Sequence, residues 1–137
     1  MARHVLITGA GRGIGLALVR HMLGRGNKVW ATYRTPEKAT ELLILADNNP
    51  HLHISQLDIT DQQQLARVAE EWQEVRFDWL INNAGIYGPK GVGFDDHDVQ
   101  TWLNVLHVNT IAPYLVTRAF YPNLVRSDSP KLAFLSS

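Results

Sequence analysis

The chain has 137 residues, with 13 Lys and Arg, 13 Asp and Glu, six His and no Cys. This length fits one domain, residues 1–137. The balanced charge disfavours nucleic-acid binding and binding to an anionic membrane surface. The longest apolar run, residues 42–46, is far shorter than the roughly 18–20 residues of a membrane-spanning helix. The N-terminus lacks a secretory signal pattern, so we expect a cytoplasmic protein, and without Cys there are no disulfides or cysteine-based zinc sites.

The first half of the chain alternates between strand and helix patterns. Residues 3–7 are apolar and partly β-branched, which predicts a strand, and a glycine cluster separates them from a helical pattern that ends at Gly24. Residues 28–33 predict a second strand. Thr35 and Pro36 are typical of a helix start, so a helix is predicted from there to about residue 46, with Glu37 in its first turn.

The second half repeats this cycle. The pattern predicts a strand over 52–57, a helix over about 61–75 capped by Thr60, a strand over 77–81, a long helix over about 98–120 and a strand over 132–135. Strands that alternate with helices predict an α/β fold, a doubly wound parallel sheet of the Rossmann type with helices on both faces. The expected strand order is 3-2-1-4-5. Nothing follows to cover the last strand, so we expect the chain to be the N-terminal part of a longer unit.

A glycine-rich loop lies between the first strand and the first helix. Gly9, Gly13 and Gly15 allow a tight turn and a close approach of the backbone to a phosphate, and the helix N-terminus favours an anion. The spacing differs from G-x-G-x-x-G, and the Lys-Ser/Thr ending of an ATP-binding loop is absent. A flexible turn is the alternative, but the strand-loop-helix context favours dinucleotide binding.

Asn109 and Pro113 lie four residues apart in the long predicted helix. Pro113 has no N–H to donate to the carbonyl of Asn109, and its ring clashes with that carbonyl. The helix is therefore expected to kink and to leave the Asn109 carbonyl free. A kink that serves packing alone is the alternative.

Several motifs together resemble the short-chain dehydrogenases/reductases. They are Thr8-Gly9-x-x-x-Gly13-Ile14-Gly15, Leu57-Asp58-Ile59, Asn82-Asn83-Ala84-Gly85 and Asn109-x-x-x-Pro113, in the order of the family and at its approximate spacing. The resemblance covers all 137 residues but only the cofactor-binding first part of a typical member. Residues 31–34, Ala-Thr-Tyr-Arg, resemble the branch of C-factor and sniffer-type carbonyl reductases.

The residues after the second predicted strand indicate which cofactor binds. An acidic residue there would accept the ribose hydroxyls of NAD, whereas an arginine accommodates the 2′-phosphate of NADP. The strand ends in Arg34, and Arg12 lies inside the glycine loop, so two guanidinium groups are placed to converge on one phosphate. We therefore predict NADP(H). The alternative is that both arginines are ordinary solvated residues.

The resemblance implies roles for further residues. Asp58 would bind the adenine amino group, Ile59 would add a backbone contact, and Asn83, Ala84 and Gly85 would flank the adenine-side ribose. The carbonyl of Asn109 would hold a water of the proton relay, and Ser137 would polarise the substrate carbonyl. A turn-forming role is the alternative for Asp58, and Ser136 is the alternative to Ser137.

The proton donor of the family, the Tyr of a Tyr-x-x-x-Lys motif, is absent from these 137 residues. The resemblance thus implies an NADP(H)-dependent oxidoreductase that interconverts a carbonyl and an alcohol, with Tyr and Lys supplied beyond Ser137. The alternative is a non-catalytic NADP(H)-binding sensor or scaffold. A small-molecule substrate and a homo-oligomer are implied as well. His51 and His53 lack a third ligand, so no metal site is predicted.

Overall fold

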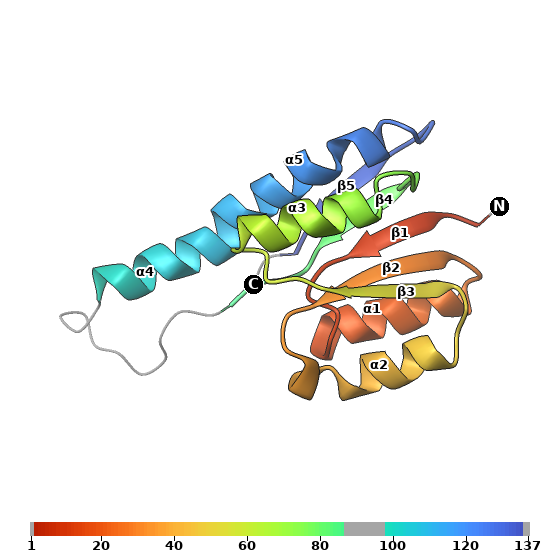
Figure 1. Cartoon of the computed structure of the whole chain (residues 1–137), viewed down its shortest axis with the longest axis horizontal. Coiled ribbons are helices and arrows are strands. Elements are labelled where there is room, and N and C mark those ends of the chain that lie inside the picture. The colour runs from red at the N-terminus through yellow and green to blue at the C-terminus, as the bar shows by residue number, and fades with distance from the viewer. Residues whose placement is uncertain (1, 87–97, 136–137) are drawn as a thin grey trace.

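The computed structural model describes residues 2–86 and 98–135, which form a five-stranded parallel sheet (Figure 1). Its order is β3-β2-β1-β4-β5, and every neighbouring pair is parallel, which confirms the predicted doubly wound α/β architecture. The strands are β1 (His4–Ile7), β2 (Lys28–Tyr33), β3 (Leu52–Gln56), β4 (Trp79–Asn82) and β5 (Lys131–Phe134).

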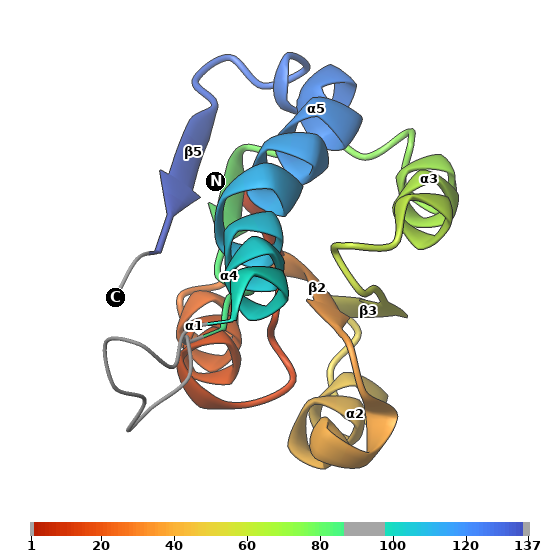
Figure 2. The same cartoon turned by 90° about the vertical axis from the view of Figure 1, so that its left-hand side faces the viewer.

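Helices cover both faces of this sheet, as the end-on view shows (Figure 2). On one face lie α1 (Gly13–Gly24) and α2 (Thr40–Asp47), and on the other lie α3 (Gln62–Glu71) and α5 (Ala112–Leu124), while α4 (Val99–Leu106) extends beyond the carboxyl ends of the strands. Within the described ranges, none of these helices is both long and apolar enough to cross a membrane.

The alternation of side chains along β1 builds two cores. Val5 and Ile7 pack with Val19 of α1 on one face, whereas Leu6 points to the other face and packs in the cluster that contains Phe120 of α5. All five side chains are fully buried. The contiguous apolar segment in the sequence is therefore a central strand that is covered on both sides.

Two predicted helix starts differ from the structure. Residues 36–38 form a short 3₁₀ turn, η1 (Pro36–Lys38), and α2 begins only after Ala39, whose backbone leaves the helical region at φ −116° and ψ 23°. Asp61, not Thr60, caps α3, because its carboxylate accepts hydrogen bonds from the backbone N–H groups of Gln63 and Gln64 at 3.0 and 3.1 Å.

Helix α3 also ends earlier than the predicted residue 75. The segment that follows is held by Asn123 of α5, a buried side chain whose amide nitrogen donates to the carbonyl oxygens of Trp72 and Val75, both at 2.8 Å. These carbonyls are satisfied without a further helical turn, so a partner 48 residues away decides where the helix stops.

The interruption predicted near Pro113 takes the form of a π turn, His107–Ile111, between α4 and α5. The N–H of Ala112 donates to the carbonyl of His107, five residues earlier. In both cartoons α4 and α5 continue in nearly the same direction, so the helix adjusts by one wide turn rather than by a sharp kink (Figures 1 and 2).

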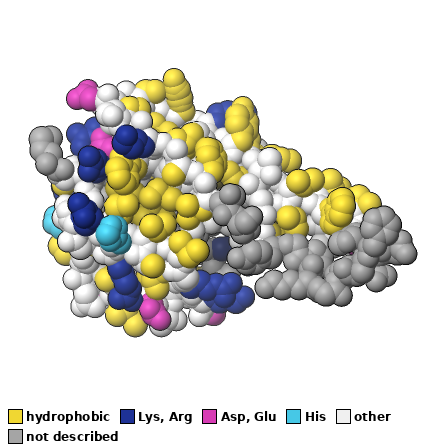
Figure 3. Space-filling model, turned by 180° about the vertical axis from the view of Figure 1, so that it is seen from behind, with side chains coloured by type: hydrophobic (Ala, Val, Ile, Leu, Met, Phe, Trp, Pro, Cys, Tyr) yellow, Lys and Arg dark blue, Asp and Glu magenta, His cyan; other side chains and the backbone are white. Residues whose placement is uncertain are grey.

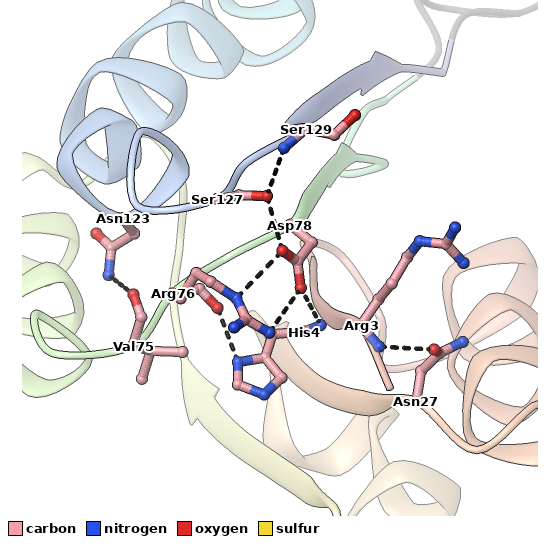
Figure 4. A network of polar contacts seen from close by, with 9 residues as sticks. All are labelled: Arg3, His4, Asn27, Val75, Arg76, Asp78, Asn123, Ser127 and Ser129. Carbon is pink, nitrogen blue, oxygen red and sulfur yellow. Dashed lines mark hydrogen bonds and ion pairs between the residues drawn. The ribbon is translucent and has the colours of Figure 1, made fainter. Parts of the chain in front are cut away.

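Asp78 joins three segments at the amino ends of the strands (Figure 4). Its carboxylate accepts from the backbone N–H of His4 at 2.8 Å, from the hydroxyl of Ser127 at 2.7 Å and from the Arg76 guanidinium at 3.2 Å. Burial raises the pKa of Asp78, but these three hydrogen bonds and the Arg76 charge outweigh it, and the net pKa lies below the ordinary value.

We expect Asp78→Asn to lower the free energy of unfolding by about 1–3 kcal/mol at neutral pH, because one amide oxygen cannot replace two charged acceptors. Since the folded pKa is depressed, this contribution is present above the unfolded value, near 3.8, and is lost as the pH falls through the folded pKa. Chemical denaturation at several pH values measures it. Asp128→Asn, at an exposed position, is the matched control, and equal stability of the two variants at pH 7 would contradict the prediction.

Candidate cofactor-binding site

The loops that follow β1 and β4 are joined at the carboxyl edge of the sheet. The hydroxyl oxygen of Thr8 accepts from the backbone N–H groups of Asn83 and Ala84 at 3.1 and 3.2 Å, and the side-chain amide of Asn83 donates to the Gly9 carbonyl at 2.9 Å. Thr8 is buried, so these bonds are shielded from water. Together they hold the glycine loop in one position against the end of β4.

Two glycines of this loop have no room for a side chain. Gly9 has φ +63°, and a Cβ there would lie 2.7 Å from the Cα of Ala84. A Cβ on Gly15 would overlap the Gly9 carbonyl oxygen and lie 2.5 Å from the amide nitrogen of Asn83. Gly13 also has a positive φ, +59°, but it faces open space. Gly9 and Gly15 therefore allow close packing because they have no side chain, whereas Gly13 allows the positive φ that the turn requires.

Within the part of the chain that the structure describes, the first backbone N–H groups of α1 have no acceptor. Arg12 occupies the capping position without a side-chain cap, and the first backbone bond of the helix runs from Leu16 N–H to the Arg12 carbonyl. The N–H groups of Gly13, Ile14 and Gly15 therefore have no acceptor within the helix. With the positive end of the helix dipole, they suit a phosphate group.

A cavity of about 490 Å³ opens in front of this helix end. Its walls come from the glycine loop and from the segments that follow β2, β3 and β4, with Asn104 and Val108 on the opposite side. The predicted cofactor residues that line it are Gly9, Arg12, Gly13, Ile14, Arg34, Asp58, Ile59, Asn83, Ala84 and Gly85. Gly15 does not line the cavity, because it packs under the loop against Gly9 and Asn83.

Asp58 presents an ionised carboxylate to this cavity. One of its oxygens accepts from the N–H and the hydroxyl of Thr60 at 3.0 and 2.7 Å. Burial raises the pKa of Asp58, but the Thr60 hydrogen bonds and the positive charges of Arg34 and His107 lower it by more, so the net pKa lies below the ordinary value. A carboxylate held in this way can accept a hydrogen bond from an amino group of a ligand.

A second cavity of about 390 Å³ shares Ile14 and residues 83–86 with the first. Asn109, Thr110 and Pro113 line it on one side, and Phe134 and Leu135 line it on the other. The Asn109 side chain donates to the Ile86 carbonyl at 2.6 Å and accepts from the Ile86 N–H at 2.8 Å. Asn109 therefore fixes the segment that separates the two cavities. Ser137, Ser136 and the glycine-rich residues 88–93 lie outside the described residues.

Tyr33, Thr35, Lys38 and Asn104 are among the lining residues of the larger cavity that sequence reasoning did not assign to the cofactor. Lys38 was placed within a predicted helix, where its side chain had no assigned partner. The 3₁₀ turn η1 instead brings Lys38 beside the glycine loop. No local pattern identifies Asn104, because it reaches the cavity only through the position of α4 beyond the carboxyl edge of the sheet.

The histidine pair is part of the sheet surface. The His53 ring stacks on Trp30 with 4.8 Å between ring centroids, and its pKa is lowered by burial first and then by the nearby charges of Lys28, His51 and His4. No group of three or more His, Asp or Glu side chains within residues 2–86 and 98–135 is arranged to hold a metal ion.

A parallel sheet with a glycine loop, unpaired helix N–H groups and a polar cavity at its carboxyl edge defines a dinucleotide-binding α/β domain. The chain belongs to the short-chain dehydrogenase family, whose profile matches residues 3–137. This confirms the family that the four motifs indicated.

Relatives and solved structures agree with this assignment. The chain is 34% identical to the NADP-dependent 3-hydroxy acid dehydrogenase YdfG of Shigella flexneri, over 90% of its own length and 50% of that protein. It matches a carbonyl reductase from Pseudomonas aeruginosa in complex with NADP at 36% identity and a TM-score of 0.89, covering 100% of this chain and 59% of the other. A carbonyl reductase Sniffer of Caenorhabditis elegans matches at 28% identity, with a TM-score of 0.87 and 100% and 64% coverage. The chain thus spans about half to two thirds of these proteins.

Proposed function

We propose that this protein is an NADP(H)-dependent oxidoreductase that interconverts a carbonyl and an alcohol on a small molecule. The observation that carries the proposal is the larger cavity, where unpaired N–H groups of α1 and the side chains of Arg12 and Arg34 surround one space. An acidic residue after β2 would favour NAD, and Arg34 stands there instead. The NADP named with the Shigella relative and the Pseudomonas structure supports the same cofactor.

The residues of the cavity fit the parts of this cofactor. The helix N-terminus at Gly13 suits the pyrophosphate, and Arg12 and Arg34 suit the 2′-phosphate through charge-assisted hydrogen bonds. Asp58 and Ile59 form the adenine end, and Asn83, Ala84 and Gly85 form the wall along the ribose. The close contact of Gly9 with Ala84 keeps this wall at a fixed distance from the glycine loop.

When bound, the nicotinamide supplies or accepts a hydride at the substrate carbon. The smaller cavity is where we place the substrate, beside Asn109 and Pro113. The main-chain carbonyl of Asn109, opposite a proline that cannot donate to it, would hold a water that carries protons, and Ser137 would orient the substrate carbonyl. The Tyr and Lys that would complete proton transfer are assigned to residues outside 1–137.

We also assign the protein to the cytoplasm and to a homo-oligomer. The second assignment is supported by large apolar side chains that α4 and α5 expose; Figure 3 shows hydrophobic groups along the α4 end of the molecule. The most exposed of these on the two helices are Val99, Trp102, Leu103, Tyr114 and Tyr121. Exposed apolar side chains that gather on one part of a surface are typical of sites that bind another protein chain.

Fluorescence titration and an NADPH oxidation assay on the full-length protein test the proposed function. We expect tighter binding of NADPH than of NADH, and oxidation of NADPH with at least one member of a panel of small aldehydes and ketones. Binding without turnover across the panel would favour the sensor or scaffold function. Failure to bind either dinucleotide would overturn both the oxidoreductase function and the sensor or scaffold function.

A further inference from the structure

A third cation lies beside the two arginines that the sequence identified. A cavity of about 420 Å³ between α1 and the segment from η1 to α2 adjoins the larger one. The two cavities share Gly11, Arg12, Gly13 and Lys38 as lining residues. Lys38 and Arg12 therefore stand where the cavities meet, and Arg34 lines the larger one.

The turn that carries Lys38 is held in place by the backbone. The N–H of Lys38 donates to the Thr35 carbonyl at 3.1 Å, and the N–H of Ala39 donates to the Pro36 carbonyl at 3.0 Å. Ala39 is buried against the glycine loop, so closely that a Cβ on Gly11 would lie 3.0 Å from the Cβ of Ala39. Lys38 thus projects from a turn whose position relative to the glycine loop is set by packing.

The charges around this point are not neutralised in pairs. Within residues 2–86 and 98–135, no carboxylate lies within ion-pair distance of Arg12, Arg34 or Lys38. Arg20, which lines the cavity of about 420 Å³, differs because it pairs with Glu41 at 3.1 Å. Three cations that form no close ion pair lie at this end of the cavity, with Asp58 lining the same cavity and Glu37 lining the cavity of about 420 Å³. A dianionic group placed among the three cations would gain charge-assisted hydrogen bonds.

The geometry points to Lys38 as a further residue that determines cofactor specificity, a third cation for the 2′-phosphate of NADP(H). This inference rests on the proposed function. An ammonium group on a flexible stem suits this place. Arg12 and Arg34 can bind phosphate oxygens with paired N–H groups, and Lys38 adds a mobile point charge from the side of the cavity of about 420 Å³.

Lys38→Gln in the full-length protein tests this inference, with Lys28→Gln as the matched control at the opposite end of β2. We expect Lys38→Gln to weaken binding of NADPH and of 2′,5′-ADP by about fivefold to tenfold and to leave NADH binding within twofold. The loss should shrink at high salt, because screening weakens an exposed charge contact. Lys28→Gln should change none of these values. Lys38 is exposed, so the variant is expected to fold, and its melting temperature checks this.

Three outcomes would overturn the inference. Equal losses for NADPH and NADH would mean that Lys38 supports the turn and not the 2′-phosphate. Unchanged NADPH binding by Lys38→Gln would mean that the ammonium group lies in solvent and does not contact the 2′-phosphate. In that case, tight NADPH binding by the unaltered protein would still support the proposed function. A protein that binds neither dinucleotide before any substitution would remove the proposed function and this inference with it.

Discussion

Gly15→Ala is expected to weaken NADPH binding by roughly tenfold to 100-fold while the sheet remains folded. A methyl group at this position overlaps the Gly9 carbonyl oxygen and approaches the Asn83 amide nitrogen to 2.5 Å. Neither atom can move away easily, because the first belongs to the backbone and the second donates a hydrogen bond to it. The glycine loop must therefore move away from α1, and overpacking of this kind costs about 1–3 kcal/mol. Isothermal titration with NADPH and far-ultraviolet circular dichroism measure the two effects.

Gly24→Ala is the matched control, since Gly24 lies in the same helix and a Cβ there meets nothing within 4 Å. We expect this variant to bind NADPH normally and to be slightly more stable, by about 0.4–1 kcal/mol, because alanine restricts the unfolded chain. A folded Gly15→Ala protein that binds NADPH within twofold of the unaltered protein would show that the glycine loop is not the phosphate site.

Arg34→Glu is expected to reduce NADPH binding by about 100-fold and NADH binding by less than threefold. The substitution removes a charge-assisted hydrogen bond and places a carboxylate against the 2′-phosphate, and each effect is worth about 1.5 kcal/mol or more, roughly tenfold in the dissociation constant. Titration of the two cofactors side by side gives the ratio of their dissociation constants.

Arg25→Glu is the matched control. It makes the same change of charge at the other end of α1, outside the cavities of about 490 Å³ and 420 Å³. It should leave the ratio unchanged, which separates a local contact from the effect of net charge. Equal losses for NADPH and NADH in Arg34→Glu would refute the assignment of Arg34 to the 2′-phosphate.

The fold was largely predictable because the strands carry their own signal. Apart from Lys28, residues 28–33 are apolar, β-branched or aromatic, and residues 28–33 form β2 with those bounds. The strand order followed from the alternation of strands and helices, since right-handed crossovers leave few arrangements of a parallel sheet. The bounds of α2 and α3 were harder, because Ala39 and Asn123 act through contacts that no local pattern contains.

The residues proposed to bind the cofactor, namely Gly9, Arg12, Arg34, Asp58 and Asn83, could be placed together because each lies in the segment that follows a strand. The carboxyl ends of parallel strands meet at one edge of the sheet. Lys38 and Asn104 could not be placed in this way, since each reaches the cavity through the packing of a neighbouring element. The sequence singled out Asn109 but did not predict the hydrogen bonds between its side chain and the Ile86 backbone, because Ile86 lies 23 residues away in the chain.

By itself, the sequence determined the parallel sheet, the position of the glycine loop and the residue types at the strand ends, because these depend on periodicity and on backbone freedom within a few residues. The tertiary structure alone decided which side chains share a cavity, that Asp61 rather than Thr60 caps α3, and that the helix passes Pro113 through a π turn. Those outcomes depend on which donors and acceptors find partners across the fold, and such contacts are formed only when distant segments pack together.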